Sequence, residues 1–288
     1  MVLEALQDAT GGTVQRTICP FCVASGKNTR KKKLDYHPDT GWWSCWRCGA
    51  HGRLHQGADA AEAHGRLERA RKAPSWGGAS APRVHPPHAF TPLGRHRSFF
   101  SEPARRYALN RGITEIAIAE GLFGYVYQKP IDEDEADFRG RLVVPILAPG
   151  SSEWIGYVGR DYTKQSSLPY LYARGMKRGG ILYREEILWE KTDRPALVVE
   201  GTLDAAFLWP DGVAVLGTWD QQQIELFKQA QRPLVALLDG DAWRKGEALA
   251  MTMTLFGKKS GYVRLPPKKD PDEMDRSWLR DEVERCLR

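Results

Sequence analysis

Two short apolar runs that each end in acidic residues constrain the fold of this chain most. Residues 196–199 (Ala-Leu-Val-Val) lead into Glu200, and residues 234–238 (Leu-Val-Ala-Leu-Leu) lead into Asp239 and Asp241. Short runs rich in Val and Leu, without polar alternation, are typical of parallel strands that are buried on both faces. The carboxyl ends of such strands meet at one edge of an open α/β sheet. The sequence therefore predicts a mostly parallel sheet with carboxylates gathered at one edge.

Further acids extend this set. Asp204 follows Glu200 by four residues, and Asp270 and Asp272 follow a third apolar run. Taken singly, each acid is more often a helix cap or a solvated loop residue, and Glu200 and Asp241 are candidates to cap the helices after them. As a group, carboxylates beside glycines suit Mg²⁺ or Mn²⁺, and many polymerases use two such ions about 4 Å apart. The pattern predicts a metal-dependent nucleotidyl-transfer site with two or more ions.

Four of the five cysteines form two Cys-x-x-Cys pairs, Cys19 with Cys22 and Cys45 with Cys48. Two such knuckles, brought together by a hairpin, place four thiolates tetrahedrally around a structural zinc ion. Residues 39–41 (Asp-Thr-Gly) supply a turn between candidate strands on either side. A redox pair or incidental thiols are the alternative, but two correctly spaced pairs seldom occur together. We therefore expect a small β domain, a zinc ribbon, that holds one structural Zn²⁺.

Basic and aromatic residues accompany the cysteines. Residues 1–97 carry 15 Lys and Arg against 7 Asp and Glu, whereas residues 98–288 carry 27 against 29. Basic groups follow phosphates, and exposed aromatic rings stack on unpaired bases. Alternatively, the indoles form a small core under a solvated basic face. The residues that we expect to contact DNA are Lys31, Lys32, Lys33, Trp42 and Arg47.

No apolar stretch reaches the roughly 18 residues that span a bilayer, and the first ten residues lack the pattern of a signal peptide. We therefore expect a soluble cytoplasmic protein without a membrane partner.

Two segments resemble the signatures of the Toprim domain, which bacterial-type primases, topoisomerases and some nucleases share. They are Val198–Asp204 (V-V-E-G-T-L-D) and Leu238–Asp241 (L-D-G-D). Other segments are similar to the DnaG-type DNA primases in the same order, and the cysteine ribbon lies where these enzymes have their zinc-binding domain. The resemblance covers nearly all of the chain except the linker. The matching segments are residues 141–146, 154–160, 168–172, 177–183, 215–218 and 265–273.

The resemblance implies roles for single residues. It makes Glu200 the catalytic acid and Asp239 and Asp241 metal ligands, so that these three form the catalytic set. Pro169 stands where the family has a lysine, and residues 242–246 (Ala-Trp-Arg-Lys-Gly) replace a usual small-Gly-Arg sequence. The remaining members of the acidic metal cluster are Asp204, Asp270 and Asp272, and the implied nucleotide- or template-binding residues are Arg141, Arg160, Tyr170, Lys177 and Arg178.

Composition and the resemblance together predict that the chain is organised in four segments. We expect the zinc ribbon over residues 1–55 and a flexible linker rich in Pro, Gly and Ala over residues 56–95. Residues 96–190 are expected to form the N-terminal subdomain of an RNA polymerase core. Residues 191–288 are expected to form the Toprim catalytic subdomain, of α/β type, with a short tail.

The resemblance implies a DNA primase that copies single-stranded DNA into short RNA primers from NTPs at the replication fork of a bacterial or phage-infected cell. The implied partners are the template, NTPs, the RNA primer–DNA hybrid, and a separate replicative helicase or DNA polymerase. The sequence ends 15 residues past Glu273, so we expect a stand-alone, phage- or plasmid-type enzyme or the primase half of a split system. Two alternatives stay open: a metal-dependent Toprim nuclease or topoisomerase-like enzyme, and a non-catalytic module that binds replication-site DNA.

Overall fold

A computed structural model of the chain describes residues 15–18, 32–36, 42–45, 51–53, 82–94, 98–131, 136–176 and 178–288. The chain divides into two compact units, residues 1–74 with 150–152, and residues 75–149 with 153–288. Several residues singled out in the sequence lie outside the described part, and their predicted roles are not tested by the structure: Cys19, Cys22, Cys48, Lys31, Arg47 and Lys177.

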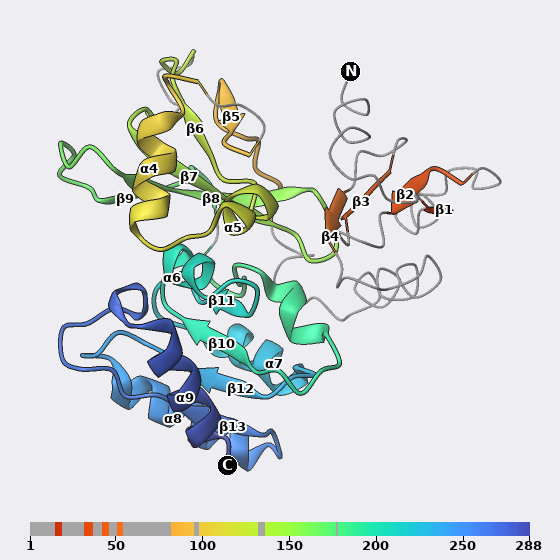
Figure 1. Cartoon of the computed structure of the whole chain (residues 1–288), viewed down its shortest axis with the longest axis vertical. Helices are drawn as coiled ribbons and strands as arrows, with labels where there is room; N and C mark the ends of the chain where they lie inside the picture. Colours follow the sequence, from red (N-terminus) through yellow and green to blue (C-terminus); the bar gives the residue numbers. More distant parts are fainter. Residues whose placement is uncertain are drawn as a thin grey trace. The chain divides into compact units, whose positions relative to one another are not determined.

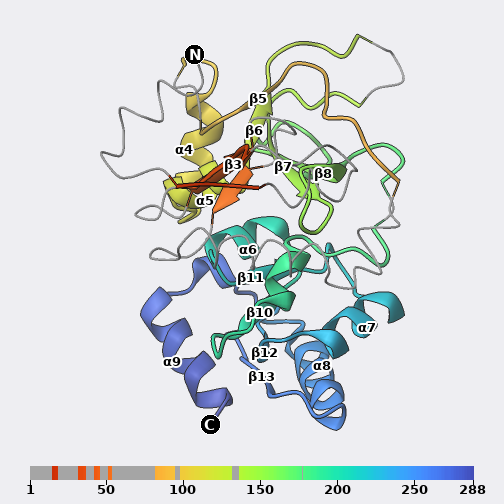
Figure 2. The same cartoon turned by 90° about the vertical axis from the view of Figure 1, so that its right-hand side faces the viewer.

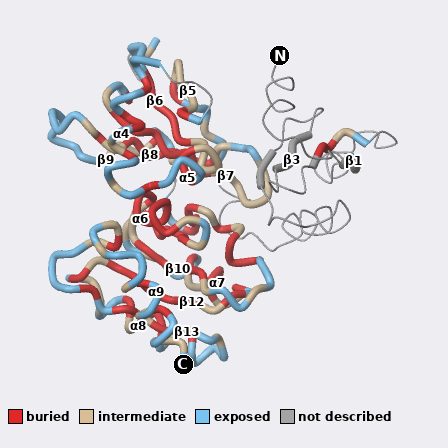
Figure 3. Tube along the Cα trace, in the orientation of Figure 1, coloured by how far each residue is buried: buried red, intermediate tan, exposed pale blue. Residues whose placement is uncertain are grey.

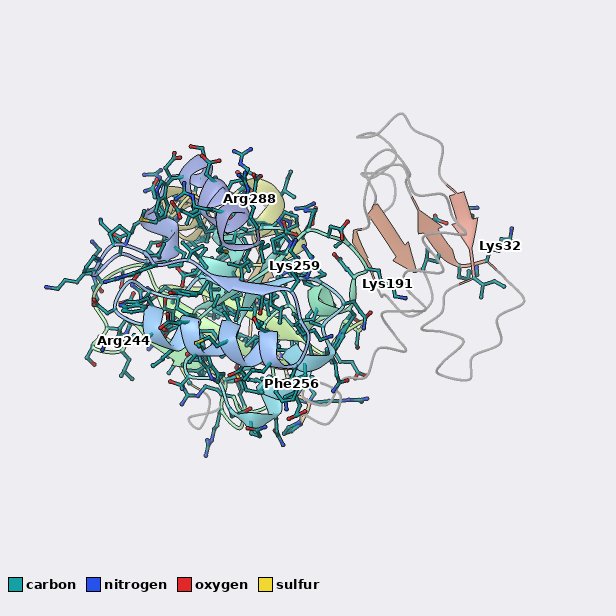
Figure 4. The ribbon with its side chains drawn as sticks, turned by 90° about the horizontal axis from the view of Figure 1, so that it is seen from below. Lys32, Lys191, Arg244, Phe256, Lys259 and Arg288 are labelled. Atoms are coloured by element: carbon teal, nitrogen blue, oxygen red, sulfur yellow. The ribbon has the colours of Figure 1, made fainter. Side chains whose placement is uncertain are left out.

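The first unit contains a four-stranded antiparallel sheet in the order β1-β2-β3-β4. Leu34 pairs with Cys45 and Tyr36 with Trp43, which confirms the predicted pairing of two strands around residues 39–41. Trp42 and Cys45 are the first and last residues of β3. Lys32, labelled in Figure 4, is exposed just before β2. The strands are β1 (Gln15–Thr17), β2 (Leu34–Tyr36), β3 (Trp42–Cys45) and β4 (His51–Arg53).

The second unit begins with a five-stranded antiparallel sheet in the order β5-β6-β7-β8-β9 (Figure 1). Helix α4 (Glu102–Asn110) packs against β7, and α5 (Glu115–Glu120) begins after Thr114, whose hydroxyl accepts a hydrogen bond from the Ala117 N–H at 3.2 Å. The strands are β5 (Phe90–Pro92), β6 (Gly124–Val126), β7 (Arg141–Leu147), β8 (Trp154–Asp161) and β9 (Tyr170–Tyr172).

Strand β5 lies within the segment that the sequence assigned to the linker, and for these three residues that assignment is wrong. Phe90 pairs with Val126 and Pro92 with Gly124 in the antiparallel register of β5 and β6. The Phe90 ring also meets the Trp154 ring edge to face, with centroids 5.0 Å apart. A proline is tolerated because β5 is an edge strand.

A second sheet of the same unit is fully parallel, in the order β11-β10-β12-β13, and confirms the predicted parallel arrangement. Figure 2 shows α8 and α9 on opposite sides of this sheet. None of the helices in the described part of the chain is long and apolar enough to cross a membrane. The elements are η1 (Glu185–Trp189), β10 (Ala196–Val199), α6 (Thr202–Phe207), β11 (Gly212–Ala214), α7 (Gln221–Gln229), β12 (Leu234–Ala236), α8 (Trp243–Leu255), β13 (Ser260–Tyr262), η2 (Pro271–Glu273) and α9 (Arg276–Cys286).

The two sheets of the second unit share one hydrophobic core. Val144 and Ile146 of β7 belong to the same buried cluster as Val199 of β10 and Leu203 of α6. The buried parts of the tube in Figure 3 accordingly run through both sheets. This shared core fixes α4 and the antiparallel sheet relative to the edge of the parallel sheet where the acids lie.

Candidate active site

Strands β10 and β12 bring the two acid-ended runs side by side. They are parallel neighbours, with Val198 opposite Ala236, and the Leu237 N–H extends the ladder by donating to the Val198 carbonyl at 2.9 Å. Glu200 and Asp239 therefore leave adjacent strands at the same carboxyl edge. The predicted juxtaposition of these two acids is present in the structure.

A loop at residues 266–272 joins the same edge through Gly240. The Gly240 N–H donates to the Lys269 carbonyl at 2.8 Å, and a Cβ on Gly240 would lie 1.9 Å from the Pro266 carbonyl oxygen. Only glycine therefore allows this close approach of two backbones. Because the loop is held here, Asp270 and Asp272 come within electrostatic range of the acids on the strands.

Asp204 is buried, with 7% of its surface exposed. Burial raises its pKa to about 8, and the negative charges of Asp272, Asp239 and Asp270 act in the same direction, against the opposing effect of Arg111. The carboxyl of Asp204 is thus held where its ionised form is costly unless a cation is near.

The pKa values of Asp239 and Glu200 are also raised, by less than that of Asp204. Burial raises the pKa of Asp239 to about 6, helped by Asp270 and Glu200. Burial and Asp270 also raise the pKa of Glu200, while the Lys245 ammonium opposes the rise. Five carboxylates therefore act on one another as one set, which we call the acidic cluster: Glu200, Asp204, Asp239, Asp270 and Asp272.

The donor chemistry of the acidic cluster fits a hard divalent cation. Its members are all carboxylates, and the buried Oδ1 of Asp204 has no hydrogen-bond partner. Mg²⁺ and Mn²⁺ prefer such oxygen ligands. Among the described residues, no three acidic, His or Cys side chains already stand in a ligating arrangement. The cluster thus offers the right donors, whose mutual repulsion a cation would relieve.

Asp241 lies beside the loop of residues 266–272. It is exposed, and its Oδ1 accepts a hydrogen bond from the Lys268 N–H at 3.4 Å. The alternative that Glu200 and Asp241 serve as helix caps is wrong, because the N-cap residues of α6 and α8 are Gly201 and Ala242, and neither helix has a side-chain cap.

Arg160 and Tyr170 lie together on neighbouring strands, β8 and β9, where their backbones pair. The Arg160 guanidinium lies over the Tyr170 ring, 4.5 Å from its centroid, and its Nε donates to the Tyr107 hydroxyl at 3.0 Å. Burial raises the pKa of Tyr170 to about 12. The positive charges of Arg160 and Arg111 oppose this rise, and the negative charge of Asp204 adds to it. These two predicted residues therefore border the acidic cluster.

Arg141 and Arg178 have different surroundings. Arg141 is buried, and its guanidinium donates to the Leu168 carbonyl at 2.9 Å and to Ser166 Oγ at 2.7 Å. It thus holds the turn between β8 and β9 together. Arg178 is exposed and lies over the Tyr172 ring, 4.8 Å from the centroid.

The structure adds three residues that sequence reasoning did not single out. Arg111, which follows α4, forms an ion pair with Asp272, and its Nη2 lies 3.9 Å from Asp204 Oδ1. Tyr107 lies one helical turn before Arg111, and its hydroxyl accepts a hydrogen bond from the Arg111 guanidinium. The third residue is Lys245 of α8, whose positive charge opposes the rise in the pKa of Glu200. No local motif marks Arg111 or Tyr107, because Asp272 and Arg160, which they contact, lie more than 50 residues away in sequence.

The sequence matches no protein-family model and no curated protein. Several solved structures resemble the chain, among them three of primases. The zinc-binding and RNA polymerase domains of the Aquifex aeolicus primase are 20% identical, with a TM-score of 0.55, and the match covers 99% of this chain and 82% of that one. The RNA polymerase domain of Mycobacterium tuberculosis primase DnaG is 18% identical, with a TM-score of 0.50, covering 76% of this chain and 82% of that one.

The same Mycobacterium tuberculosis domain in complex with double-stranded DNA is 19% identical, with a TM-score of 0.52, covering 76% of this chain and 80% of that one. All three structures are of primases, and the Aquifex match spans both units of this chain. The fold of the chain therefore resembles that of the zinc-binding and RNA polymerase domains of a primase.

Proposed function

We propose that this chain is a DNA primase, a DNA-directed RNA polymerase that makes short RNA primers on single-stranded DNA. The observation that carries the proposal is the acidic cluster at the carboxyl edge of a parallel sheet, within a fold shared with primases. The motifs around Glu200 and Asp239 support the assignment of this sheet as a Toprim fold. In the reaction, the 3′-hydroxyl of one nucleotide attacks the α-phosphorus of the next, and pyrophosphate leaves.

The acidic cluster and Asp241 are proposed to hold two or more Mg²⁺ or Mn²⁺ ions. Bound ions would neutralise the triphosphate and favour the ionised 3′-hydroxyl. The raised pKa values of Asp204 and Asp239 fit this role, because carboxylates that repel one another gain most from a shared cation. Gly240 keeps the loop of residues 266–272 close enough for its acids to take part.

Arg160, Tyr170 and Arg178 are proposed to hold template and nucleotide. Arg160 and Tyr170 border the acidic cluster, so a phosphate held by the guanidinium would lie near the acids. Exposed Arg178 on the Tyr172 ring offers both a charge and a flat surface to nucleic acid. Arg141 acts indirectly, by fixing the turn that follows Arg160. Lys177 is proposed for the same site from the sequence alone.

The first unit is proposed to be a zinc ribbon that contacts template DNA. The pairing of β2 with β3 supports it, since Cys45 ends β3 as the ribbon requires. Four thiolates would fill the zinc coordination shell, which makes this Zn²⁺ structural. The DNA contacts proposed for it are Lys31, Lys32, Lys33, Trp42 and Arg47, and the zinc ligands are Cys19, Cys22, Cys45 and Cys48.

Denaturing gels of the full chain with single-stranded templates, labelled NTPs and Mg²⁺ or Mn²⁺ test the proposal. We expect labelled primers a few to tens of nucleotides long with the wild-type chain and none with Glu200→Gln. Cleavage of an end-labelled template would instead identify a nuclease. Template binding without either product, unchanged in Glu200→Gln, would identify a non-catalytic binding module.

A further inference from the structure

The C-terminal end of α4 places a guanidinium beside two members of the acidic cluster. Arg111 is the C-cap residue of this helix, and its guanidinium forms an ion pair with Asp272 while Nη2 lies 3.9 Å from Asp204 Oδ1. The side chains of Arg111, Asp204 and Asp272 are 21%, 10% and 5% exposed. The three side chains are therefore largely shielded from water, where electrostatic interactions are strong.

This ion pair is poorly explained as a device for stability alone. Removing charges from water costs several kcal/mol per ion, and buried pairs often contribute little net stability. Arg111 also leaves its Nε without a hydrogen-bond partner, as Asp204 does its Oδ1. If the guanidinium served only to stabilise the fold, we would expect Arg111 Nε and Asp204 Oδ1 to have hydrogen-bond partners.

Tyr107 connects this ion pair to the predicted nucleotide side of the site. It lies one helical turn before Arg111, and its hydroxyl accepts from Arg111 Nη1 at 3.5 Å and from Arg160 Nε at 3.0 Å. Arg160 in turn lies over the Tyr170 ring. The Tyr107 hydroxyl thus joins the guanidinium that pairs with the acids to the guanidinium of Arg160, which is proposed to hold nucleotide or template.

We propose that Arg111 is a positioning residue for catalysis, which acts through two of the carboxylates proposed to bind metal. It holds Asp204 and Asp272 at fixed places before the divalent ions bind, and through Tyr107 it fixes Arg160 relative to them. This inference rests on the proposed function, since it concerns the same acidic cluster. Two consequences follow: the guanidinium competes with metal for the carboxylates, and it keeps them in the geometry that turnover needs.

Titration of Mn²⁺ into the full chain, with free Mn²⁺ measured by electron paramagnetic resonance, tests the first consequence. Arg111→Gln removes the competing charge, so we expect Mn²⁺ to bind at least fivefold more tightly than to the wild-type chain. Arg111→Lys keeps the charge and is expected to bind within twofold of wild type. Equal or weaker Mn²⁺ binding by Arg111→Gln would overturn the proposal.

Primer synthesis by the same proteins tests the second consequence. We expect Arg111→Gln to lower kcat at least tenfold while KM for NTP changes less than threefold, and Arg111→Lys to recover only part of kcat, because an ammonium lacks the planar fork of guanidinium. The control is Arg106→Gln, on the same helix, whose exposed side chain pairs with Glu102. An equal loss of kcat in this control would refute a positioning role for Arg111.

Tyr107→Phe keeps the proposal testable if Arg111→Gln does not fold. It deletes one hydroxyl and leaves every charge in place, so we expect a three- to tenfold loss of kcat with unchanged Mn²⁺ affinity. Wild-type kcat in Tyr107→Phe would overturn the link to Arg160. If the wild-type chain makes no primers, the proposed function fails, whereas the Mn²⁺ titration still decides the role of Arg111.

Discussion

Replacing Asp204 by Asn is expected to stabilise the metal-free protein and to weaken the pH dependence of its stability. Burial and Asp272 raise the pKa of Asp204 to about 8, from an ordinary value of 3.8 that applies to the unfolded chain. The folded state therefore holds this proton more tightly than the unfolded state. Stability from this group is fully present below about pH 4 and is lost as the pH rises toward 8.

The size of the effect follows from the same interval. One pKa unit corresponds to about 1.4 kcal/mol, so the rise from 3.8 to about 8 sets an upper limit of about 6 kcal/mol at pH 8. Asp239 and Asp272 titrate together with Asp204 and share this cost. Arg111 also loses one of its two carboxylate partners in the variant. We therefore expect Asp204→Asn to gain about half the limit, ~3 kcal/mol at pH 8.

Urea unfolding followed by circular dichroism, in EDTA at pH 5, 6, 7 and 8, measures this directly. The difference in unfolding free energy between Asp204→Asn and wild type should widen steadily from pH 5 to pH 8. Asp193→Asn is the matched control, because Asp193 is exposed, and it should follow wild type throughout. Parallel pH curves for Asp204→Asn and wild type, or a less stable variant at pH 8, would refute the reasoning.

Three further perturbations test the fold and the zinc assignment. Arg232→Met should lower the free energy of unfolding, measured in urea, by roughly 3 kcal/mol. The reason is that the Arg232 side chain is 1% exposed and its loss removes a buried ion pair with Asp211. Gly212→Ala should cost about 2 kcal/mol or more, since the added Cβ would lie 2.2 Å from a backbone carbonyl oxygen of α6, and the melting temperature reports it. Cys45→Ser should release the zinc seen by elemental analysis of wild type, whereas Cys286→Ser, a free cysteine of α9, should keep it; equal zinc contents would contradict the ribbon assignment.

The parallel sheet and most of the acidic cluster could be predicted because their signals are local. Unbroken apolar runs mark β10 and β12, and the acids that follow them need only adjacent parallel strands to meet. The register of the sheet supplies that adjacency. The rule that acids after parallel strands meet at one edge of the sheet predicted that Glu200 and Asp239 are neighbours. It also predicted that the loop with Asp270 reaches the same edge.

The cation that pairs with the acids could not be predicted, because it comes from a distant element. Arg111 precedes Asp272 by 161 residues and has no motif around it that indicates an ion pair. Its position depends on how α4 packs on the antiparallel sheet, which no local pattern encodes. The surroundings of Arg141 could not be predicted either: the resemblance implied a nucleotide or template contact, and the structure shows the buried guanidinium donating to the Gly159 and Leu168 carbonyls.

The position of strand β5 could not be read from the sequence either. It has three residues, ends in Pro92 and follows a stretch rich in proline, so it has no period of two to detect. Pairing with β6 alone makes it a strand. In contrast, α8 begins at Trp243 despite the unusual residues there, and its start leaves Lys245 close enough to act on Glu200 (Arg244 and Phe256 mark its two ends in Figure 4).

Template-dependent incorporation of labelled NTP by the wild-type chain and by Asp239→Asn tests the central claim most directly. Both proteins should bind a fluorescent single-stranded DNA within twofold of each other, because Asp239 lies in the acidic cluster and not among the basic residues proposed to contact DNA. We predict primer synthesis by wild type in Mg²⁺ or Mn²⁺ and a loss of at least 100-fold in Asp239→Asn, about 2.7 kcal/mol in activation free energy. Primers made equally by both proteins, or by neither, would contradict the account.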